Sequence, residues 1–195
     1  MVSCDYMRYF HPLMVQADWT LFLDRDGVIN QRIPDQYVSQ VADFKWIAGA
    51  IEAIKYFKTR FAHVIVVTNQ AGIGKALMTE QDLQVVHDHL RTTLPNAVDL
   101  VLHCPHRPDQ NCSCRKPKPG MAIQSRQLLP SIDFRKSVMV GDSRTDLMMG
   151  RRLGMGTVYI TTRNDHQAHL NGFKPDQEYT SLAEFAARLR QYEVL

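Results

Sequence analysis

The sequence lacks any hydrophobic run long enough to cross a bilayer, since apolar segments such as TLFL and HVIVV extend over only a few residues. Residues 1–19 contain no continuous apolar stretch, so we expect no secretory signal. Low-complexity tracts, Gly/Ser linkers and internal repeats are also absent. Nothing in the sequence predicts a membrane partner, and these absences favour a cytoplasmic enzyme whose thiols stay reduced.

A strong charge of either sign is lacking too. The formal net charge is +3, which falls short of the basicity of a dedicated nucleic-acid binder but allows an anionic substrate. Hydrophobic residues make up 45% of the chain, a value typical of globular proteins, and 195 residues suffice for one domain with a buried core. We therefore expect a single monomeric domain over 1–195, with 1–19 as an amino-terminal extension and no nucleic-acid partner.

Short apolar segments rich in β-branched residues alternate with segments of helical spacing. The expected strands are nearly continuously apolar, as in strands buried on both faces, and lie at 20–24, 63–69, 98–104, 137–142 and 156–162. The expected helices lie at 48–60, 79–94, 120–129, 144–154 and 181–193. This alternation predicts an α/β, three-layer, Rossmann-like fold, in which a parallel sheet carries helices on both faces.

Polar side chains follow three of the expected strands. Asp24 and Asp26 end the first, Thr68 ends the second, and Asp142 follows a later one. Because open parallel sheets bind ligands beyond the carboxyl ends of their strands, these groups can converge there. Asp24 and Asp26 would repel each other unless a cation lay between them, and oxygen ligands of this kind favour Mg²⁺. Asp24, Asp142 and the main-chain carbonyl of Asp26 are the expected ligands.

The same residues suit phosphoryl transfer. Asp24 can attack phosphorus with its second carboxylate oxygen, and Asp26 can protonate the leaving oxygen and later deprotonate a water. Thr68 and a lysine would balance the charge on the equatorial phosphoryl oxygens.

A different phosphate-binding reading, in which GIGK at 72–75 belongs to a P-loop, fails. Asn69 stands where that motif needs its first glycine, and Ala76 stands where it needs Ser or Thr.

Four segments resemble, in order and position, the four motifs of the haloacid dehalogenase superfamily of phosphohydrolases: DRDGVIN at 24–30, VVTNQ at 66–70, RKPKPG at 115–120 and VGDSRTD at 140–146. The resemblance implies Mg²⁺ as a cofactor, a small phosphorylated metabolite as substrate and an aspartyl-phosphate mechanism. The roles that it implies are Asp24 as nucleophile, Asp26 as acid and base, Thr68 and Lys116 as phosphoryl-binding residues, Asp142 as Mg²⁺ ligand, and Asp146 as a support. We also expect substrate contacts from Arg25, Asn69, Gln70 and Arg115.

Three of the four cysteines lie close together in CPHRPDQNCSC, at 104–114. Cys104, His106, Cys112 and Cys114 supply four ligands, enough for a closed, structural zinc site. A disulfide fits three clustered thiols poorly, and uncoordinated thiols are the remaining alternative. A nucleic-acid finger needs a helix that presents base-reading side chains after its ligands, whereas here Arg115 and Lys116 follow at once. We therefore expect a zinc loop over 104–114 that braces the catalytic lysine.

The zinc loop and the motifs together resemble one branch of the superfamily, that of the heptose-bisphosphate and histidinol-phosphate phosphatases. GVIN, VVTNQAGI and RKPKPGM are more similar to the heptose enzymes, which implies removal of the C7 phosphate of a heptose 1,7-bisphosphate, with histidinol phosphate as the alternative substrate. A non-catalytic, zinc-dependent binding module is a third reading. The segments at 27–47 and 70–115 leave no room for a cap domain, so we expect an open active site whose loops set specificity.

Overall fold

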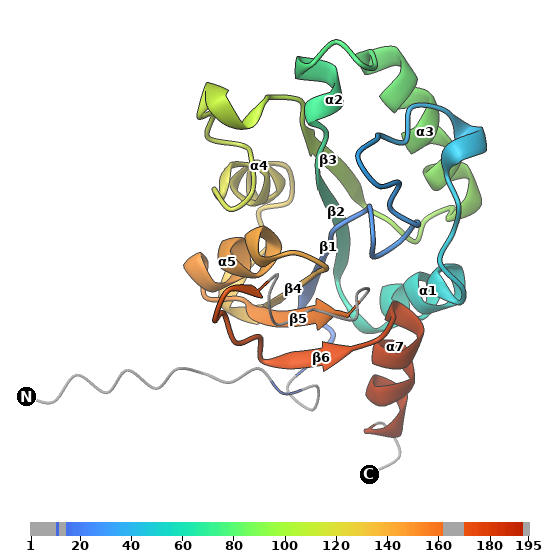
Figure 1. The fold of residues 1–195 in the computed structure, drawn as a ribbon. Coiled ribbons are helices and arrows are strands. Elements are labelled where there is room, and N and C mark those ends of the chain that lie inside the picture. Colours follow the sequence, from blue (N-terminus) through green and yellow to red (C-terminus); the bar gives the residue numbers. More distant parts are fainter. Residues whose placement is uncertain (1–10, 12–14, 162–169, 193–195) are drawn as a thin grey trace, which may run out of the picture.

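The computed structural model of the protein describes residues 11, 15–161 and 170–192, and it contains a six-stranded parallel sheet (Figure 1). The strands are β1 (Thr20–Leu23), β2 (His63–Asn69), β3 (Leu100–Cys104), β4 (Ser137–Gly141), β5 (Gly156–Ile160) and β6 (Gln177–Tyr179). Their order across the sheet is β3-β2-β1-β4-β5-β6. The sequence analysis predicted the first five and missed β6, a short strand at the edge of the sheet with the sequence QEY and no apolar run.

Helices cover both faces of the sheet (Figure 1). On one face lie α1 (Ala50–Arg60), α3 (Glu80–Thr93) and α7 (Leu182–Gln191), and on the other lie α4 (Gly120–Leu128) and α5 (Arg144–Arg152). A short helix, α2 (Ala71–Gly74), follows β2 directly. Helices on both faces of the sheet confirm the expected three-layer architecture. Each of the five longer helices also lies within a few residues of its predicted ends.

Alternation along β1 explains the layering. Leu21 and Leu23 are fully buried in the core beneath α1, α3 and α7, where they share a cluster with Phe57 and Phe185. Phe22 points to the opposite face and packs in a second cluster with Met139. Because β1 buries the side chains of both its faces, both faces must be covered, and for this reason the central strands consist mostly of consecutive apolar residues.

The predicted amino-terminal extension is partly integrated into the domain. Val15 and Trp19 are buried in the larger core cluster, and the main-chain amide of Ala62 donates to the carbonyl of Trp19 at 2.8 Å. The rest of that segment, 1–10 and 12–14, lies outside the described residues, and so does Cys4. At least Val15 and Trp19 of the predicted extension therefore belong to the packed domain.

Between β1 and α1 the chain forms a loop rather than a cap domain. Its only helical segment is the 3-10 turn η2 (Val41–Asp43), and Asn30 makes isolated bridges to Asp26 and Trp46. The β3–α4 connection likewise holds only the turn η3 (Pro108–Gln110). Within the described ranges no helix is both long and apolar enough to span a membrane.

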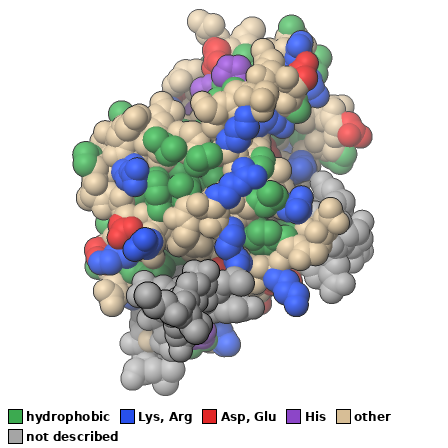
Figure 2. Space-filling model, turned by 90° about the vertical axis from the view of Figure 1, so that its left-hand side faces the viewer, with side chains coloured by type: hydrophobic (Ala, Val, Ile, Leu, Met, Phe, Trp, Pro, Cys, Tyr) green, Lys and Arg blue, Asp and Glu red, His purple; other side chains and the backbone are tan. Residues whose placement is uncertain are grey.

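The outer side of α4 and α5 carries Lys and Arg side chains among hydrophobic ones (Figure 2). Arg144, Arg151 and Arg152 of α5 are all exposed. Arg152 donates to the main-chain carbonyl of Pro117 at 2.8 Å, and Arg151 pairs with Asp176. None of these three side chains reaches the pocket described below.

Candidate active site

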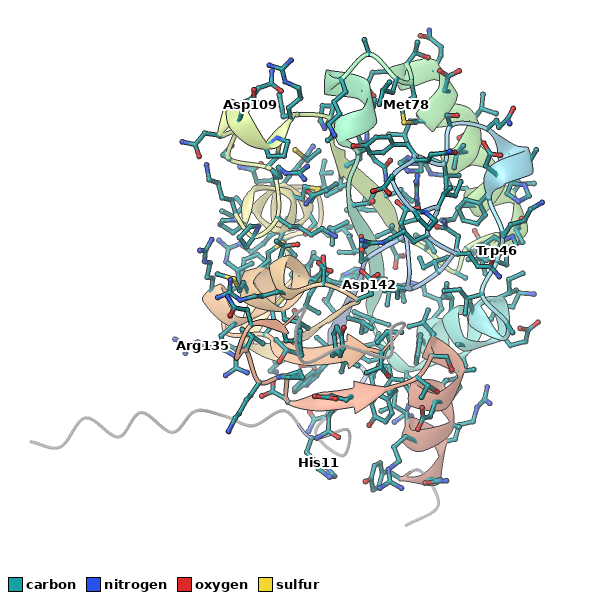
Figure 3. All side chains as sticks on the ribbon, in the orientation of Figure 1. His11, Trp46, Met78, Asp109, Arg135 and Asp142 are labelled. Carbon is teal, nitrogen blue, oxygen red and sulfur yellow. The ribbon has the colours of Figure 1, made fainter. Side chains whose placement is uncertain are left out.

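The carboxyl ends of β1, β2 and β4 meet at a pocket of about 440 Å³. Asp142 follows β4 near the centre of the molecule, whereas Asp109 lies at the periphery, in the zinc loop (Figure 3). The predicted site residues that line the pocket are Asp24, Asp26, Thr68, Asn69, Arg115 and Lys116. The parallel topology thus brings together side chains from three segments that are far apart in the sequence, as expected for ligand sites in open sheets.

Lys116 lies at the centre of a buried network of charges. Its ammonium group donates to the Asp24 carboxylate at 2.6 Å and to the main-chain carbonyl of Val67 at 2.8 Å, and it pairs with the Asp146 carboxylate at 2.6 Å. The lysine and both carboxylates are almost completely buried. One cation between two buried anions holds the predicted nucleophile and its supporting residue in place.

Asn69 holds the main chain at Lys116. The amide of Lys116 donates to Asn69 Oδ1 at 3.1 Å, and Asn69 Nδ2 donates back to the Lys116 carbonyl at 3.3 Å. Asn69 still lines the pocket, where it was expected to contact the substrate. Its two hydrogen bonds give it a further task, since they tie the end of β2 to the residue that follows the zinc loop.

Asp26 is fixed by three neighbours. Its carboxylate accepts hydrogen bonds from Arg25 Nη2 at 3.0 Å, from Asn30 at 2.9 Å and from Gln70 at 2.8 Å. The Gln70 amide also donates to Thr68 at 2.8 Å. Arg25 is 0% exposed and Gln70 is 1% exposed, and neither lines the pocket. The expectation that Arg25 and Gln70 contact the substrate is therefore corrected. Both side chains are buried and point toward Asp26 instead of into the pocket.

Two of the three predicted Mg²⁺ ligands, the carboxylates of Asp24 and Asp142, lie close enough to share one ion, and the predicted support Asp146 lies beside them. Carboxylate oxygens of Asp24, Asp142 and Asp146 all lie within 4.8 Å of one another. Gly27 has a φ of +91°, and a Cβ there would lie 2.1 Å from Asp142 Oδ2, so this glycine leaves the room that Asp142 needs. Hard oxygen donors this close together fit Mg²⁺.

Arg32 already brings positive charge to these ligand atoms. Its Nη2 donates to Asp142 Oδ1 at 2.8 Å and to the main-chain carbonyl of Asp26 at 3.3 Å. These are two of the three groups that the sequence predicted as Mg²⁺ ligands. The sequence analysis did not assign Arg32 to the site, because nothing local in QRIPDQYV indicates that this side chain reaches β4.

Burial and crowding shift the protonation of the carboxylates. Burial, and next the charge of Asp146, raise the pKa of Asp24 to about 6, against the opposing effect of Lys116. Burial and the charge of Asp24 raise the pKa of Asp142 to about 8. Burial acts in the same direction on Asp26, but the charge of Arg25 and the hydrogen bonds from Asn30, Arg25 and Gln70 outweigh it and lower the pKa. Asp24 and Asp142 therefore favour a further cation even with Lys116 and Arg32 beside them, whereas Arg25 and its neighbouring hydrogen-bond donors keep Asp26 ionised.

The four predicted zinc ligands also converge. Sγ of Cys104 lies 3.5 Å from that of Cys112 and 3.2 Å from that of Cys114, and the last two lie 3.4 Å apart. Nδ1 of His106 lies 3.7 Å and 3.2 Å from the sulfurs of Cys104 and Cys114. Tetrahedral ligands with Zn–S bonds of about 2.3 Å lie about 3.8 Å apart, close to these separations. The three cysteines are free thiols, so the disulfide alternative is not supported for this cluster.

The zinc loop is tied to the pocket on both sides. The amide of Gly74, in α2, donates to the carbonyl of Pro105 at 2.9 Å, and the amide of Gly120 donates to that of Ser113 at 3.1 Å. Arg115 lines the pocket, and its Nη1 donates to the His106 carbonyl at 3.4 Å. The loop therefore ends at the two basic residues of the pocket, as a brace for Arg115 and Lys116 requires.

Comparison with known proteins agrees with this geometry. A family model described as HAD-hydrolase-like matches residues 113–185. A D-glycero-alpha-D-manno-heptose-1,7-bisphosphate 7-phosphatase of Mycobacterium bovis is 36% identical over 171 residues, which cover 86% of this chain and 90% of the relative. A D-glycero-beta-D-manno-heptose-1,7-bisphosphate 7-phosphatase of Helicobacter pylori is 34% identical over 155 residues, 77% of this chain and 87% of the relative. The crystal structure of D,D-heptose 1,7-bisphosphate phosphatase from B. bronchiseptica, in complex with magnesium and phosphate, superimposes with a TM-score of 0.79 at 30% identity and covers 89% of this chain and 98% of its own.

Proposed function

The chain belongs to the haloacid dehalogenase superfamily, in the branch of the heptose-1,7-bisphosphate 7-phosphatases, and on that premise we propose that it removes the C7 phosphate of D-glycero-D-manno-heptose 1,7-bisphosphate. The observation that carries the proposal is the pocket in which Asp24 and Lys116 meet, beside Asp26, at the ends of β1 and β2. The same arrangement argues against a non-catalytic binding module, because the proposed nucleophile, the proposed acid and base and the proposed phosphoryl-binding residues all line this pocket.

The chemistry that this site supports is a double displacement at phosphorus. Asp24 attacks phosphorus through a carboxylate oxygen, and the bond between phosphorus and the sugar oxygen breaks as Asp26 donates a proton to that oxygen. A water molecule then gives a proton to Asp26 and attacks the phosphoryl group, which breaks the bond to Asp24 and releases inorganic phosphate. Asp26 is ionised in the free protein, and the negative charge of an arriving phosphate raises its affinity for the proton it must donate.

The surrounding residues stabilise the transferring group. Lys116 and the hydroxyl of Thr68 would neutralise and hydrogen-bond the equatorial oxygens, where negative charge accumulates. Asp24, Asp142 and the main-chain carbonyl of Asp26 would hold Mg²⁺, which when bound supplies the positive charge that lets a carboxylate approach an anionic phosphate. Arg115 at the pocket wall would contact a second phosphate of the substrate.

Zinc in this proposal is structural. Cys104, His106, Cys112 and Cys114 fill four positions of a tetrahedron and leave none open for water, so the ion would hold the loop without entering the reaction. Free thiols that bind zinc also fit a reducing compartment, and we therefore assign the protein to the cytoplasm.

Phosphate release tests the proposal. Initial rates with Mg²⁺ are compared on both anomers of heptose 1,7-bisphosphate and on histidinol phosphate, and the proposal expects kcat/KM to be larger on a heptose bisphosphate. Asp24→Asn should lower kcat by at least about 1,000-fold, because the nucleophile is lost. Asp18→Asn is the matched control, since Asp18 is exposed and pairs with Lys136 outside the pocket. A preference for histidinol phosphate would overturn the substrate, and an active Asp24→Asn variant would overturn the nucleophile.

A further inference from the structure

The Arg25 guanidinium is shared between Asp26 and a histidine of α3. Its Nη2 binds both carboxylate oxygens of Asp26 at 3.0 Å, whereas its Nη1 lies 3.2 Å from Nε2 of His87. Arg25 is 0% exposed and His87 is 2% exposed, so neither side chain can turn to water for a partner. Only the Arg25 side chain therefore separates His87 from Asp26, the predicted acid and base, and His87 does not line the pocket.

The chemistry of the two groups determines the direction of this hydrogen bond. A guanidinium in a protein is always protonated and has no acceptor, so Arg25 must donate and His87 Nε2 must accept. An accepting Nε2 carries no proton, which requires His87 to be neutral with its proton on Nδ1. Without this acceptor the Nη1 group would be a buried donor with no partner, a condition that folded proteins avoid.

Burial and most of the charges around His87 also favour its neutral form. Burial, followed by the charges of Arg25, His103 and Arg91, lowers the pKa of His87 to about 3, and Asp26 opposes them. His103, on β3, has its ring centre 5.8 Å from that of His87, and its own Nε2 lies 2.9 Å from the Glu80 carboxylate. Burial and the charge of Arg25 thus keep His87 neutral, with its lone pair available for Arg25.

We propose that His87 is a positioning residue for the reaction: it holds Arg25 side-on against Asp26 and so sets the orientation in which Asp26 delivers its proton to the leaving oxygen. The inference rests on the proposed function, because it assigns His87 a task only if Asp26 is the general acid. Asp26 is 22% exposed at its side chain, and its open side faces the pocket, so a rotation of Arg25 would turn the carboxylate away from the substrate.

The experiment exploits the dependence of acid catalysis on the leaving group. A sugar alkoxide needs a proton to leave, whereas p-nitrophenolate leaves without one. His87→Leu should therefore lower kcat on the sugar phosphate by about 10- to 100-fold, as second-layer partners of active groups typically do, and on p-nitrophenyl phosphate by only a few-fold. His87→Gln should restore most of the rate, because its Oε1 can accept from Arg25 Nη1.

The control is His89→Gln, on the same helix, where the imidazole packs against Phe44 and Trp46 outside the site and the rates should stay unchanged. An equal loss of rate on both substrates in His87→Leu would show a purely structural role and overturn the proposal. A second measurement needs no activity. Nitrogen NMR of the wild-type imidazole should show a neutral Nδ1–H tautomer at pH 6, and a charged His87 there would overturn the inference even if the phosphatase activity stands. Absence of phosphate release from either substrate would instead refute the proposed function.

Discussion

Replacement of Arg32 should tighten the binding of Mg²⁺. The Arg32 guanidinium donates hydrogen bonds to two of the proposed ligand atoms, Asp142 Oδ1 at 2.8 Å and the Asp26 carbonyl oxygen at 3.3 Å. A metal ion that binds there must displace it. Arg32→Met keeps a side chain of similar length and removes the charge, so the ion no longer has to break an ion pair before it binds.

The expected change in Mg²⁺ affinity follows from the solvent exposure of the Arg32–Asp142 ion pair. The Arg32 side chain is 41% exposed and that of Asp142 is 2% exposed, so the pair lies at the boundary between solvent and interior. A partly exposed ion pair stabilises a protein by about 1 kcal/mol at most, because water screens one partner. The dissociation constant for Mg²⁺ should therefore fall by about fivefold, and the metal-free protein should lose about 2–4 °C of melting temperature.

Isothermal titration calorimetry measures the affinity, at a pH above the pKa of Asp142, which burial raises to about 8, so that protons do not compete with the metal. Thermal melts with chelator and with saturating Mg²⁺ complete the test, and the difference in melting temperature should vanish when metal is present. Arg91→Met is the matched control, because Arg91 is 43% exposed and pairs with Asp88 on the surface of α3. Weaker Mg²⁺ binding in Arg32→Met would refute the reasoning and make Arg32 a helper of the metal site.

Three further predictions concern the metal sites and acid stability. Gly27→Ala should weaken Mg²⁺ binding at least about tenfold, because its Cβ would lie 2.1 Å from Asp142 Oδ2, whereas Gly154→Ala, with a similar positive φ but its nearest atom at 3.9 Å, should cost only about 1 kcal/mol of stability. Cys112→Ser should lower the zinc content found by elemental analysis and slow phosphate release, with Mg²⁺ affinity retained; full zinc occupancy would contradict the ligand set. The pKa of His87 in the folded protein is about 3, below its value in the unfolded chain. The contribution of His87 to the free energy of unfolding should therefore be fully present above about pH 6.5 and should be lost as the pH falls toward 3, by up to about 4 kcal/mol. Denaturant titrations of wild type and His87→Gln over this pH range measure the loss. An equal acid dependence in the two proteins would exclude His87 as the source.

Patterns local to the chain predicted most of the fold and the outline of the site. The period of apolar residues indicated five strands and five helices, and the placement of Asp24, Thr68 and Asp142 at strand ends followed from that reading. The spacing of three cysteines and a histidine likewise indicated the cluster that these four side chains form. Such features are visible in sequence because each depends on residues only a few positions apart.

The contacts made by Arg25, Arg32 and His87 were decided by the tertiary structure. Arg25 stands between two pocket carboxylates in the sequence, yet its side chain turns inward to His87, which lies sixty-two residues away on α3. Arg32 reaches Asp142 across one hundred and ten residues. No local period encodes such meetings, because they depend on how a helix seats against the sheet and on where a loop lies once the strands have paired. Sequence alone therefore determined which groups could do chemistry in this protein, and the packing of its layers decided which of them face the substrate and which hold the others in place.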